Sequence, residues 1–142
     1  FARPDKLVFA LIGDGGFQMA IPELATLATH GLPLKIVIVN NGYLGMVRQW
    51  QELFFNNRLC AVELECFPDV ALLAAAYGLK GRTIAHPSEL TAALEEAVRE
   101  PGPYLLCVKV SPEENVYPMV PAGAAISEMV LGPPQPVAVP EQ

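Results

Sequence analysis

Charged residues are scarce in this 142-residue chain, since Asp, Glu, Lys and Arg make up 17% of it where about 25% is usual in globular domains. Hydrophobic residues make up 52%, and the mean hydropathy of +0.34 excludes a disordered chain. No apolar run approaches the ~20 residues of a membrane span, and no secretion signal opens the chain. We therefore expect a cytoplasmic globular protein without a membrane partner.

Positive charge and cysteine are also scarce. Nine Lys and Arg stand against fifteen Asp and Glu, giving a net charge of -6, and the cations do not cluster. Nucleic-acid binding requires a basic face, so nucleic acid is excluded as a partner. Cys60, Cys66 and Cys107 form no C-x-x-C pair, which excludes a disulfide framework and a thiolate zinc site.

Three apolar runs, at residues 7–12, 34–39 and 104–110, contain almost no polar residue. Unbroken runs of this kind are typical of parallel strands buried on both faces. Helical periodicity falls between them, and the predicted helices are 21–30, 44–55, 68–77 and 87–99. The alternation predicts an α/β fold with an open, mainly parallel sheet and helices on both faces.

The domain boundaries follow from composition. We expect one domain over residues 1–132, with a short helix at 124–130, and a proline-rich C-terminal tail at 133–142. The chain opens without Met, two residues before its first strand-like run. We therefore expect the domain to be truncated at its N-terminus.

Two polar loops follow the first two predicted strands. They are Gly13-Asp14-Gly15-Gly16 and Asn40-Asn41-Gly42, and ligands of open α/β sheets bind beyond the carboxyl ends of strands. Glycines let backbone N–H groups approach an anion, but a carboxylate among them repels phosphate unless a cation lies between. Oxygens of Asp14, Asn41 and a nearby carbonyl suit Mg²⁺, which completes its octahedron with phosphate oxygens and water.

Other phosphate-binding motifs fit less well. A dinucleotide site requires a small residue where Gln18 stands and an acid at the end of the second strand, and a P-loop requires Gly-Lys-Ser/Thr. Either loop alone is more often an ordinary turn. Their occurrence together after consecutive strands, with Asp14 and Asn41 27 positions apart, favours a ligand site.

The pattern GDG, then a helix and a strand, then NN resembles the thiamine diphosphate (ThDP) motif. Residues 41–51 (NGYLGMVRQWQ) and 114–125 (ENVYPMVPAGAA) further resemble the catalytic subunit of acetolactate synthase, also called acetohydroxyacid synthase. The similarity runs from residue 2 to about 132 and covers the C-terminal part of such a subunit.

The resemblance implies a set of site residues. Asp14, Asn41 and the main-chain carbonyl of Tyr43 would hold Mg²⁺, which bridges to the ThDP diphosphate. The full cofactor-binding set would be Gly13, Asp14, Gly15, Gly16, Asn41, Tyr43, Gly45 and Met46. In this family the residue that matches Met46 lies beside the active site, and the residue that matches Trp50 lines the pocket for the second substrate and for inhibitors.

The resemblance also implies an activity. In this family, pyruvate is decarboxylated and joined to a second 2-keto acid, a step of branched-chain amino acid biosynthesis. No catalytic residue is expected in this chain, because the glutamate that activates ThDP belongs to another domain and is contributed across a subunit interface. Expected partners are the other domains, a second catalytic subunit and a regulatory small subunit, while any FAD would bind outside this segment.

Several alternatives stay open. Without the resemblance, Met46, Trp50 and Leu53 at i, i+4, i+7 favour a core stripe. The protein could be another ThDP-dependent 2-keto acid decarboxylase or oxidase, or a catalytically silent module that keeps the fold. We also expect the isolated chain to be inactive.

Further polar residues have competing interpretations. Arg48 and Gln49 would contact a substrate carboxylate or be solvated. The remaining residues are Glu23, His30 and His86, interpreted as helix-end residues, and Tyr117 and Met119, which would cover the cofactor cleft or belong to an ordinary loop.

Overall fold

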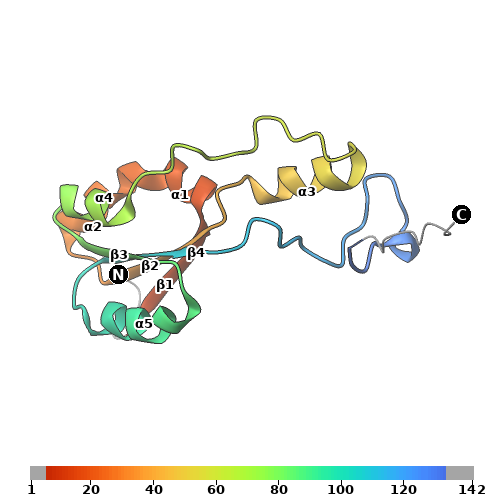
Figure 1. Ribbon diagram of the computed structural model, residues 1–142. Coiled ribbons are helices and arrows are strands. Elements are labelled where there is room, and N and C mark those ends of the chain that lie inside the picture. Colours follow the sequence, from red (N-terminus) through yellow and green to blue (C-terminus); the bar gives the residue numbers. More distant parts are fainter. Residues whose placement is uncertain (1–5, 134–142) are drawn as a thin grey trace, which may run out of the picture.

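The computed structural model describes residues 6–133 and contains a four-stranded sheet (Figure 1). The strands are β1 (Val8–Gly13), β2 (Leu34–Asn40), β3 (Lys80–Ile84) and β4 (Tyr104–Lys109). Their order is β1-β2-β4-β3, and every neighbouring pair is parallel. The predicted open parallel sheet is confirmed.

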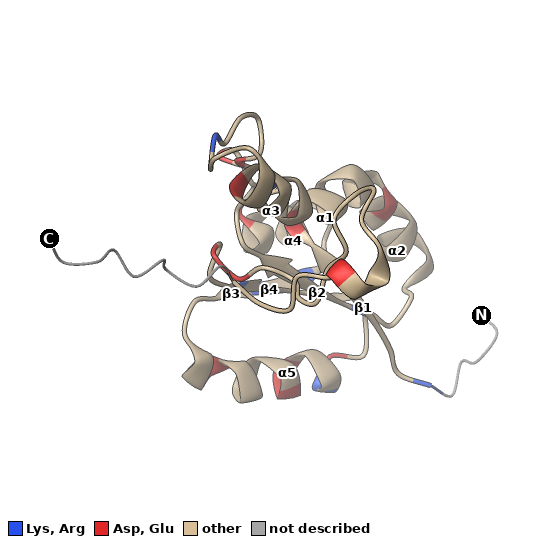
Figure 2. Cartoon of the chain, turned by 90° about the vertical axis from the view of Figure 1, so that its right-hand side faces the viewer, with Lys and Arg blue, Asp and Glu red and all other residues tan. Residues whose placement is uncertain are grey.

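Helices lie on both faces of the sheet, as predicted. The helices and 3₁₀ turns are α1 (Asp14–Ala20), η1 (Ile21–Glu23), α2 (Leu24–His30), α3 (Gly45–Phe54), α4 (Val70–Ala76), η2 (Pro87–Glu89), α5 (Leu90–Arg99) and η3 (Ile126–Glu128). Figures 1 and 2 show α1, α2 and α4 on one face and α5 on the other. Gly31 ends α2, because it adopts the left-handed conformation with φ +56° and Leu32 N donates to the Leu27 carbonyl at 3.3 Å.

Two cores follow from this layering. Beneath α1, α2 and α4 lie Phe17, Leu24, Leu27, Ile36, Ile38, Val70, Ala74, Leu105 and Cys107. Beneath α5 lie Ile84, Ala93, Ala97, Tyr104 and Leu106. The central strand β4 supplies both clusters, because alternate residues of a strand point to opposite faces.

β3 was missed by the sequence prediction. Its residues Lys80, Gly81 and Arg82 resemble a polar loop after Gly78. It forms because β4 pairs with it and α4 packs closely over it, such that a Cβ on Gly81 would lie 2.8 Å from the Ala74 Cβ.

The prediction of burial on both faces is wrong for β1. Ala10 and Ile12 pack against the larger core, but Phe9 and Leu11 on the opposite face are 45% and 75% exposed. The reason is that α5 packs mainly on β4 and β3, so within residues 6–133 this face of β1 is left largely uncovered.

Other elements differ in detail from the sequence prediction. Helix α1 begins at Asp14, directly after β1, and a 3₁₀ turn separates it from α2. The helix expected at 124–130 is only a 3₁₀ turn. The tail expected at 133–142 lies, beyond residue 133, outside the described residues. In the part of the chain that is described, no helix is both long and apolar enough to cross a membrane.

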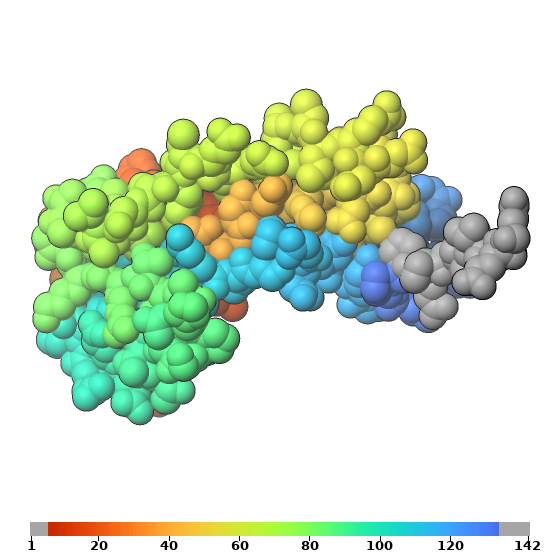
Figure 3. All heavy atoms as spheres, in the orientation of Figure 1, coloured from red at the N-terminus to blue at the C-terminus, as the bar shows by residue number. Residues whose placement is uncertain are grey.

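α3 and residues 112–133 together form an arm that extends from the sheet (Figures 1 and 3). At its base the two chain segments run side by side, where Val110 N donates to the Asn40 carbonyl at 2.9 Å. Within it, Met119 and Val130 form an antiparallel bridge. The arm therefore begins at the carboxyl ends of β2 and β4.

Candidate functional site

The two polar loops meet at the carboxyl ends of β1 and β2. Gly13 and Val39 are register partners in these neighbouring strands, so Asp14 and Asn40–Gly42 leave the sheet side by side. The Asp14 carboxylate is 2% exposed; its Oδ2 accepts from Gly42 N at 2.7 Å and its Oδ1 from Gly15 N at 2.8 Å. The structure thus brings Asp14 and the Asn40–Gly42 loop into direct contact. The prediction of a loop at residues 13–16 is wrong, because helix α1 begins at Asp14 directly after β1.

Asp14 retains the capacity to bind a cation. Each carboxylate oxygen can accept about two hydrogen bonds, and each accepts one here. The described residues contain no group of three or more His, Cys, Asp or Glu that could hold a metal ion. A cation at Asp14 would therefore be held by one carboxylate, neutral oxygens and the ligand's own oxygens, which is how proteins usually bind Mg²⁺.

The Asn41 loop has a defined conformation. Asn41 Oδ1 accepts from Tyr43 N at 3.1 Å, and Gly42 adopts φ +72°. Gly45 leaves room beside it, because a Cβ there would lie 3.1 Å from Asn41 Nδ2 and would press on this amide. Residues 62–64 support the loop, since Leu44 N donates to the Val62 carbonyl and Leu64 N to the Gly42 carbonyl, both at 2.8 Å.

The Tyr43 side chain is engaged away from the loop. Its hydroxyl donates to Glu63 Oε1 at 3.2 Å, and the Arg48 guanidinium lies 5.3 Å from the ring centroid. Burial and the neighbouring Glu63 raise the pKa of Tyr43. If Tyr43 contributes to a metal site, its main-chain carbonyl is therefore the group that would do so.

The glycines around Asp14 fall into two groups. A Cβ on Gly15 would lie 2.8 Å from Leu44 Cδ2, and one on Gly16 3.2 Å from Ile12 Cγ1. A Cβ on Gly13 or Gly42 would meet nothing within 4 Å. The first two glycines permit close packing within the chain, whereas the last two leave free space beside Asp14.

A cavity of about 520 Å³ adjoins the Asn41 loop at the carboxyl ends of β2, β4 and β3. Its polar lining includes Asn40, Thr83 and Lys109. Cys107 also lines it and accepts a hydrogen bond from Asn40 Nδ2 at 3.7 Å. Burial raises the pKa of the Cys107 thiol, so this side chain is a protonated structural group.

Met46 and Trp50 both lie on α3. Met46 is 55% exposed, and Trp50 packs edge-on against Phe54 with ring centroids 5.2 Å apart. A groove of about 480 Å³ is lined by Val47, Trp50, Gln51, Phe55 and Arg58, and Met46 is not part of it. Neither Met46, Trp50 nor Leu53 is fully buried in this chain, so they do not form a core stripe here.

The helix-end residues lie where the sequence predicted them. Glu23 precedes α2 and accepts from Thr26 Oγ1 at 3.1 Å, and His30 is in the last turn of α2. His86 caps the 3₁₀ turn before α5.

The role of Gln49 was missed. This residue is 1% exposed and bonds to Val116 and Met119, so it is neither solvated nor free to contact a substrate carboxylate. A lone glutamine in an amphipathic helix gives no sequence signal of such a contact. The Tyr117 hydroxyl, in the same segment, is buried without a hydrogen-bond partner among the described residues.

An open parallel sheet with a buried carboxylate and an amide loop at adjacent strand ends places this chain among the α/β domains whose ligand sites lie at the carboxyl ends of the strands, and its oxygens could hold a cation beside a phosphorylated ligand. Residues 1–108 match a family model described as "Thiamine pyrophosphate enzyme, C-terminal TPP binding domain", thiamine pyrophosphate being another name for ThDP. The chain belongs to this family.

Individual relatives confirm the resemblance found in the sequence. The chain is 46% identical over 129 residues to the acetolactate synthase isozyme 2 large subunit of Escherichia coli (strain K12), covering 91% of this chain and 24% of that protein. It is 43% identical over 129 residues to the acetolactate synthase large subunit of Lactococcus lactis subsp. lactis (strain IL1403), covering 91% and 22%. The chain thus spans about a quarter of the length of these relatives.

A solved structure shares the fold. The Rhodococcus jostii RHA1 thiamine diphosphate-dependent 4-hydroxybenzoylformate decarboxylase superposes with a TM-score of 0.71 at 30% identity, over 78% of this chain and 21% of that one.

Proposed function

We propose that this chain is the diphosphate- and Mg²⁺-binding part of a ThDP-dependent acetolactate synthase. The complete protein would decarboxylate pyruvate and join the product to a second 2-keto acid. The observation that carries the proposal is the contact between buried Asp14 and the Asn41 loop at adjacent strand ends. The 46% identity to an acetolactate synthase large subunit supports the choice of reaction.

The residues at the strand ends would hold the cofactor. Asp14, Asn41 and the Tyr43 carbonyl would bind Mg²⁺, and Gly15 and Gly16 would lie close to the diphosphate. The free space over Gly13 would admit the cofactor, and the absence of a side chain at Gly45 leaves room for the Asn41 amide. When bound, ThDP supplies the electron sink for decarboxylation and carbon–carbon bond formation.

The substrate-facing surface is assigned to α3. Met46 contacts the cofactor and the first substrate, and Trp50 lines the pocket for the second 2-keto acid. The exposure of Met46 and the groove beside Trp50 support this role, since neither side chain is used to pack the core.

Other parts of the complete protein are required for activity. The exposed Phe9 and Leu11 and the short span relative to the relatives support docking of this chain onto further domains and a second subunit. We expect residues 1–142 alone, with Mg²⁺, ThDP and pyruvate, to form no acetolactate, because the glutamate that activates ThDP belongs to another domain. Acetolactate formation by the isolated chain would contradict this.

Cofactor titration tests the metal site. Asp14→Ala and Asn41→Ala in the complete protein should each weaken Mg²⁺-dependent ThDP binding by more than about tenfold, or about 1.4 kcal/mol, because each removes an oxygen ligand of the ion. Isothermal titration calorimetry measures the affinity.

Two controls accompany this titration. Asp14→Asn keeps the side-chain shape and separates loss of charge from loss of folding, and Glu95→Gln removes a carboxylate on the distant α5. Unchanged ThDP affinity in both alanine variants would refute the site.

A second candidate is a ThDP-dependent 2-keto acid decarboxylase, favoured by the structural similarity to the Rhodococcus jostii enzyme. It predicts carbon dioxide and an aldehyde from pyruvate where the synthase forms acetolactate. A product assay on the complete protein separates the two. A silent module predicts no Mg²⁺-dependent ThDP binding.

A further inference from the structure

Gln49 is the polar side chain by which α3 holds residues 112–133, the second segment of the arm. Its Nε2 donates to the Val116 carbonyl at 2.9 Å, and its Oε1 accepts from Val116 N at 2.9 Å. The same Nε2 lies 3.1 Å from Met119 Sδ. Within residues 6–133, all hydrogen bonds between α3 and residues 112–133 involve Gln49.

Gln51 makes the same kind of contact on another side of α3. Its Nε2 donates to the Cys60 carbonyl at 3.1 Å, and its Oε1 accepts from Cys60 N at 2.9 Å. The helix is therefore tied through one glutamine to residues 112–133 and through the other to the 56–60 segment. The two ties differ in exposure, because Gln49 is buried and Gln51 is partly open to solvent.

The two glutamines bracket one face of α3. Each residue of an α-helix turns by about 100°. Relative to Gln49, Met46 then lies at about 60°, Trp50 at about 100° and Gln51 at about 200° around the helix axis. The face that carries Met46 and Trp50 therefore lies between the two tied segments.

The segment held by Gln49 contains an unused polar group. Tyr117 lies between Val116 and Met119, and its buried hydroxyl has no hydrogen-bond partner among the described residues. Since Gln49 contacts Val116 and Met119 on either side of Tyr117, it holds the backbone that carries this ring against α3.

We infer that Gln49 is a positioning residue of the substrate pocket. It contacts neither substrate nor cofactor but fixes Val116–Met119 against α3, beside the helix face that carries Met46 and Trp50, and so sets the shape of the surface next to this face for the second 2-keto acid. This inference rests on the proposed function for its substrate and on the hydrogen bonds for its geometry.

The test is Gln49→Glu in the complete protein. An ionised glutamate still accepts from Val116 N but cannot donate to the Val116 carbonyl, whereas a protonated one can, so the donated half of the tie is lost at pH 8 and restored as the pH falls. Loss of the donated bond, with the carboxylate facing the Val116 carbonyl, should raise KM for the second 2-keto acid about tenfold at pH 8, with kcat and ThDP affinity little changed. Recovery of KM at lower pH is expected only if the tie itself is responsible.

Two physical readouts accompany KM. Amide hydrogen exchange at residues 116–119 should accelerate in the variant at pH 8. In a version of the protein with any other tryptophans replaced, the emission of Trp50, the single tryptophan of this chain, should shift. Neither readout requires an active enzyme, so they separate failure of this inference from failure of the proposed function, which would appear as absent ThDP binding.

Gln49→Met and Thr91→Glu complete the design. Gln49→Met removes both bonds to Val116 without adding charge and should reproduce the changes in KM and exchange without pH dependence. Thr91→Glu adds the same ionisable carboxylate at an exposed residue of the distant α5 and should change KM less than threefold.

Three results would overturn the inference. They are unchanged exchange and KM in both Gln49 variants, equal effects of the Thr91 variant, and failure of both Gln49 variants to fold, which would make Gln49 a folding residue only.

Discussion

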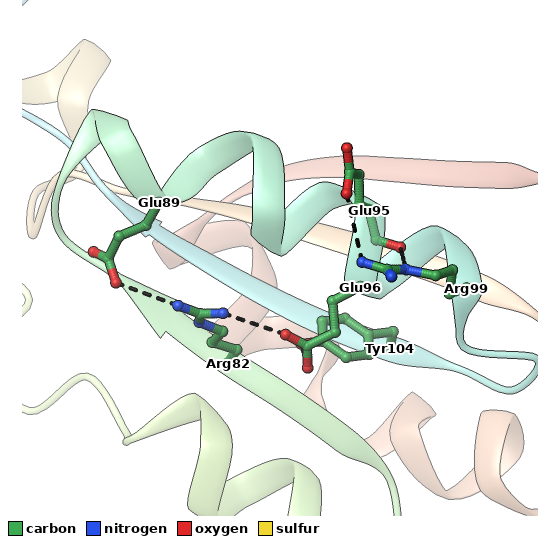
Figure 4. Close-up of polar contacts among 6 residues, drawn as sticks. All are labelled: Arg82, Glu89, Glu95, Glu96, Arg99 and Tyr104. Atoms are coloured by element: carbon green, nitrogen blue, oxygen red, sulfur yellow. Dashed lines mark hydrogen bonds and ion pairs between the residues drawn. The ribbon is translucent and has the colours of Figure 1, made fainter.

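The two edge strands of the sheet, β1 and β3, have opposite surface chemistry. β3 carries Lys80 and Arg82, and each is paired with carboxylates from or beside α5. Lys80 Nζ lies 2.6 Å from Glu100 Oε2, and Arg82 lies 3.4 Å from Glu89 and 3.3 Å from Glu96. Figure 4 shows Arg82 between these two glutamates, with Tyr104 beside Glu96.

β1 has no such charges. Val8–Gly13 contains no ionisable residue, and Phe9 and Leu11 are exposed. Figure 2 shows acidic residues along α5. Soluble proteins protect sheet edges with charge, while large exposed apolar surfaces mark interfaces. The difference indicates that β3 is an edge suited to solvent, and we expect another part of the protein to pack against β1.

The largest expected effect comes from placing a charge on the β1 face. Leu11→Lys in the complete protein should prevent assembly or folding, because an unpaired charge in an interface costs several kcal/mol. In the isolated chain the same change should alter stability by no more than about 0.5 kcal/mol, since Leu11 is 75% exposed there. Size-exclusion chromatography and denaturation measure the two effects.

Val98→Lys is the matched control for Leu11→Lys. It adds the same charge to α5, at a residue that is 49% exposed. Normal assembly of the Leu11 variant, or equal damage by the Val98 variant, would remove the distinction between the two edges.

A pair of glycine substitutions compares the packing at the edges. Gly81→Ala on β3 places a Cβ 2.8 Å from the Ala74 Cβ and 3.1 Å from the Leu105 carbonyl oxygen, and should destabilise the chain by about 1–3 kcal/mol. Gly13→Ala at the end of β1 meets nothing within 4 Å at φ −75°, and should change stability by less than about 0.5 kcal/mol. Urea denaturation tests both, and equal costs would contradict the structure.

The ion pairs of β3 give a smaller, salt-dependent effect. Arg82→Met removes both contacts of the guanidinium and should slightly lower the melting temperature at low ionic strength, with the difference shrinking in high salt. Arg99→Met is the control, because within residues 6–133 the one ion pair of Arg99 is with Glu95, one turn away on α5, at 3.5 Å. A deficit of the Arg82 variant that does not depend on salt would show that packing, and not charge, determines the loss.

The smallest expected effect is the pH dependence of the β3 edge. Lys80 lowers the pKa of Glu100, and the backbone N–H groups of Ala85 and His86 lower that of Glu89. Their contribution to stability is complete above the usual value of 4.5 and is lost as the pH falls through the lower folded-state values. In Glu100→Gln, stability should therefore fall less steeply as the pH is lowered. Thermal melts from pH 7 to 3 measure this.

Glu100 also raises the pKa of Lys80. The stability from Lys80 is present below its usual value of 10.5 and is lost as the pH rises through the raised value. In Glu100→Gln, stability should therefore also fall less steeply as the pH rises above 10.5. Melts of Glu95→Gln provide the control. An unaltered pH dependence of the melting temperature in the Glu100 variant would contradict the Lys80–Glu100 pair.

The fold was predictable from sequence wherever an element is encoded by local pattern. The apolar runs located three of the four strands, and helical periodicity located α3, α4 and α5 to within about three residues. β3 was not predictable, because Lys80, Gly81 and Arg82 form a strand only when β4 and α4 supply pairing and packing. The meeting of Asp14 with the Asn40–Gly42 loop was predictable, since the carboxyl ends of neighbouring parallel strands adjoin, but the start of α1 at Asp14 was not.

The sequence by itself determined the parallel sheet, the meeting of Asp14 with the Asn41 loop, and the resemblance to ThDP enzymes. Only the tertiary structure decided that β1 is an open edge and that Gln49 is buried against Val116, 67 positions away. The physical reason is that periodicity and loop chemistry are local properties, whereas burial and the choice of a hydrogen-bond partner depend on which distant segment packs against a residue.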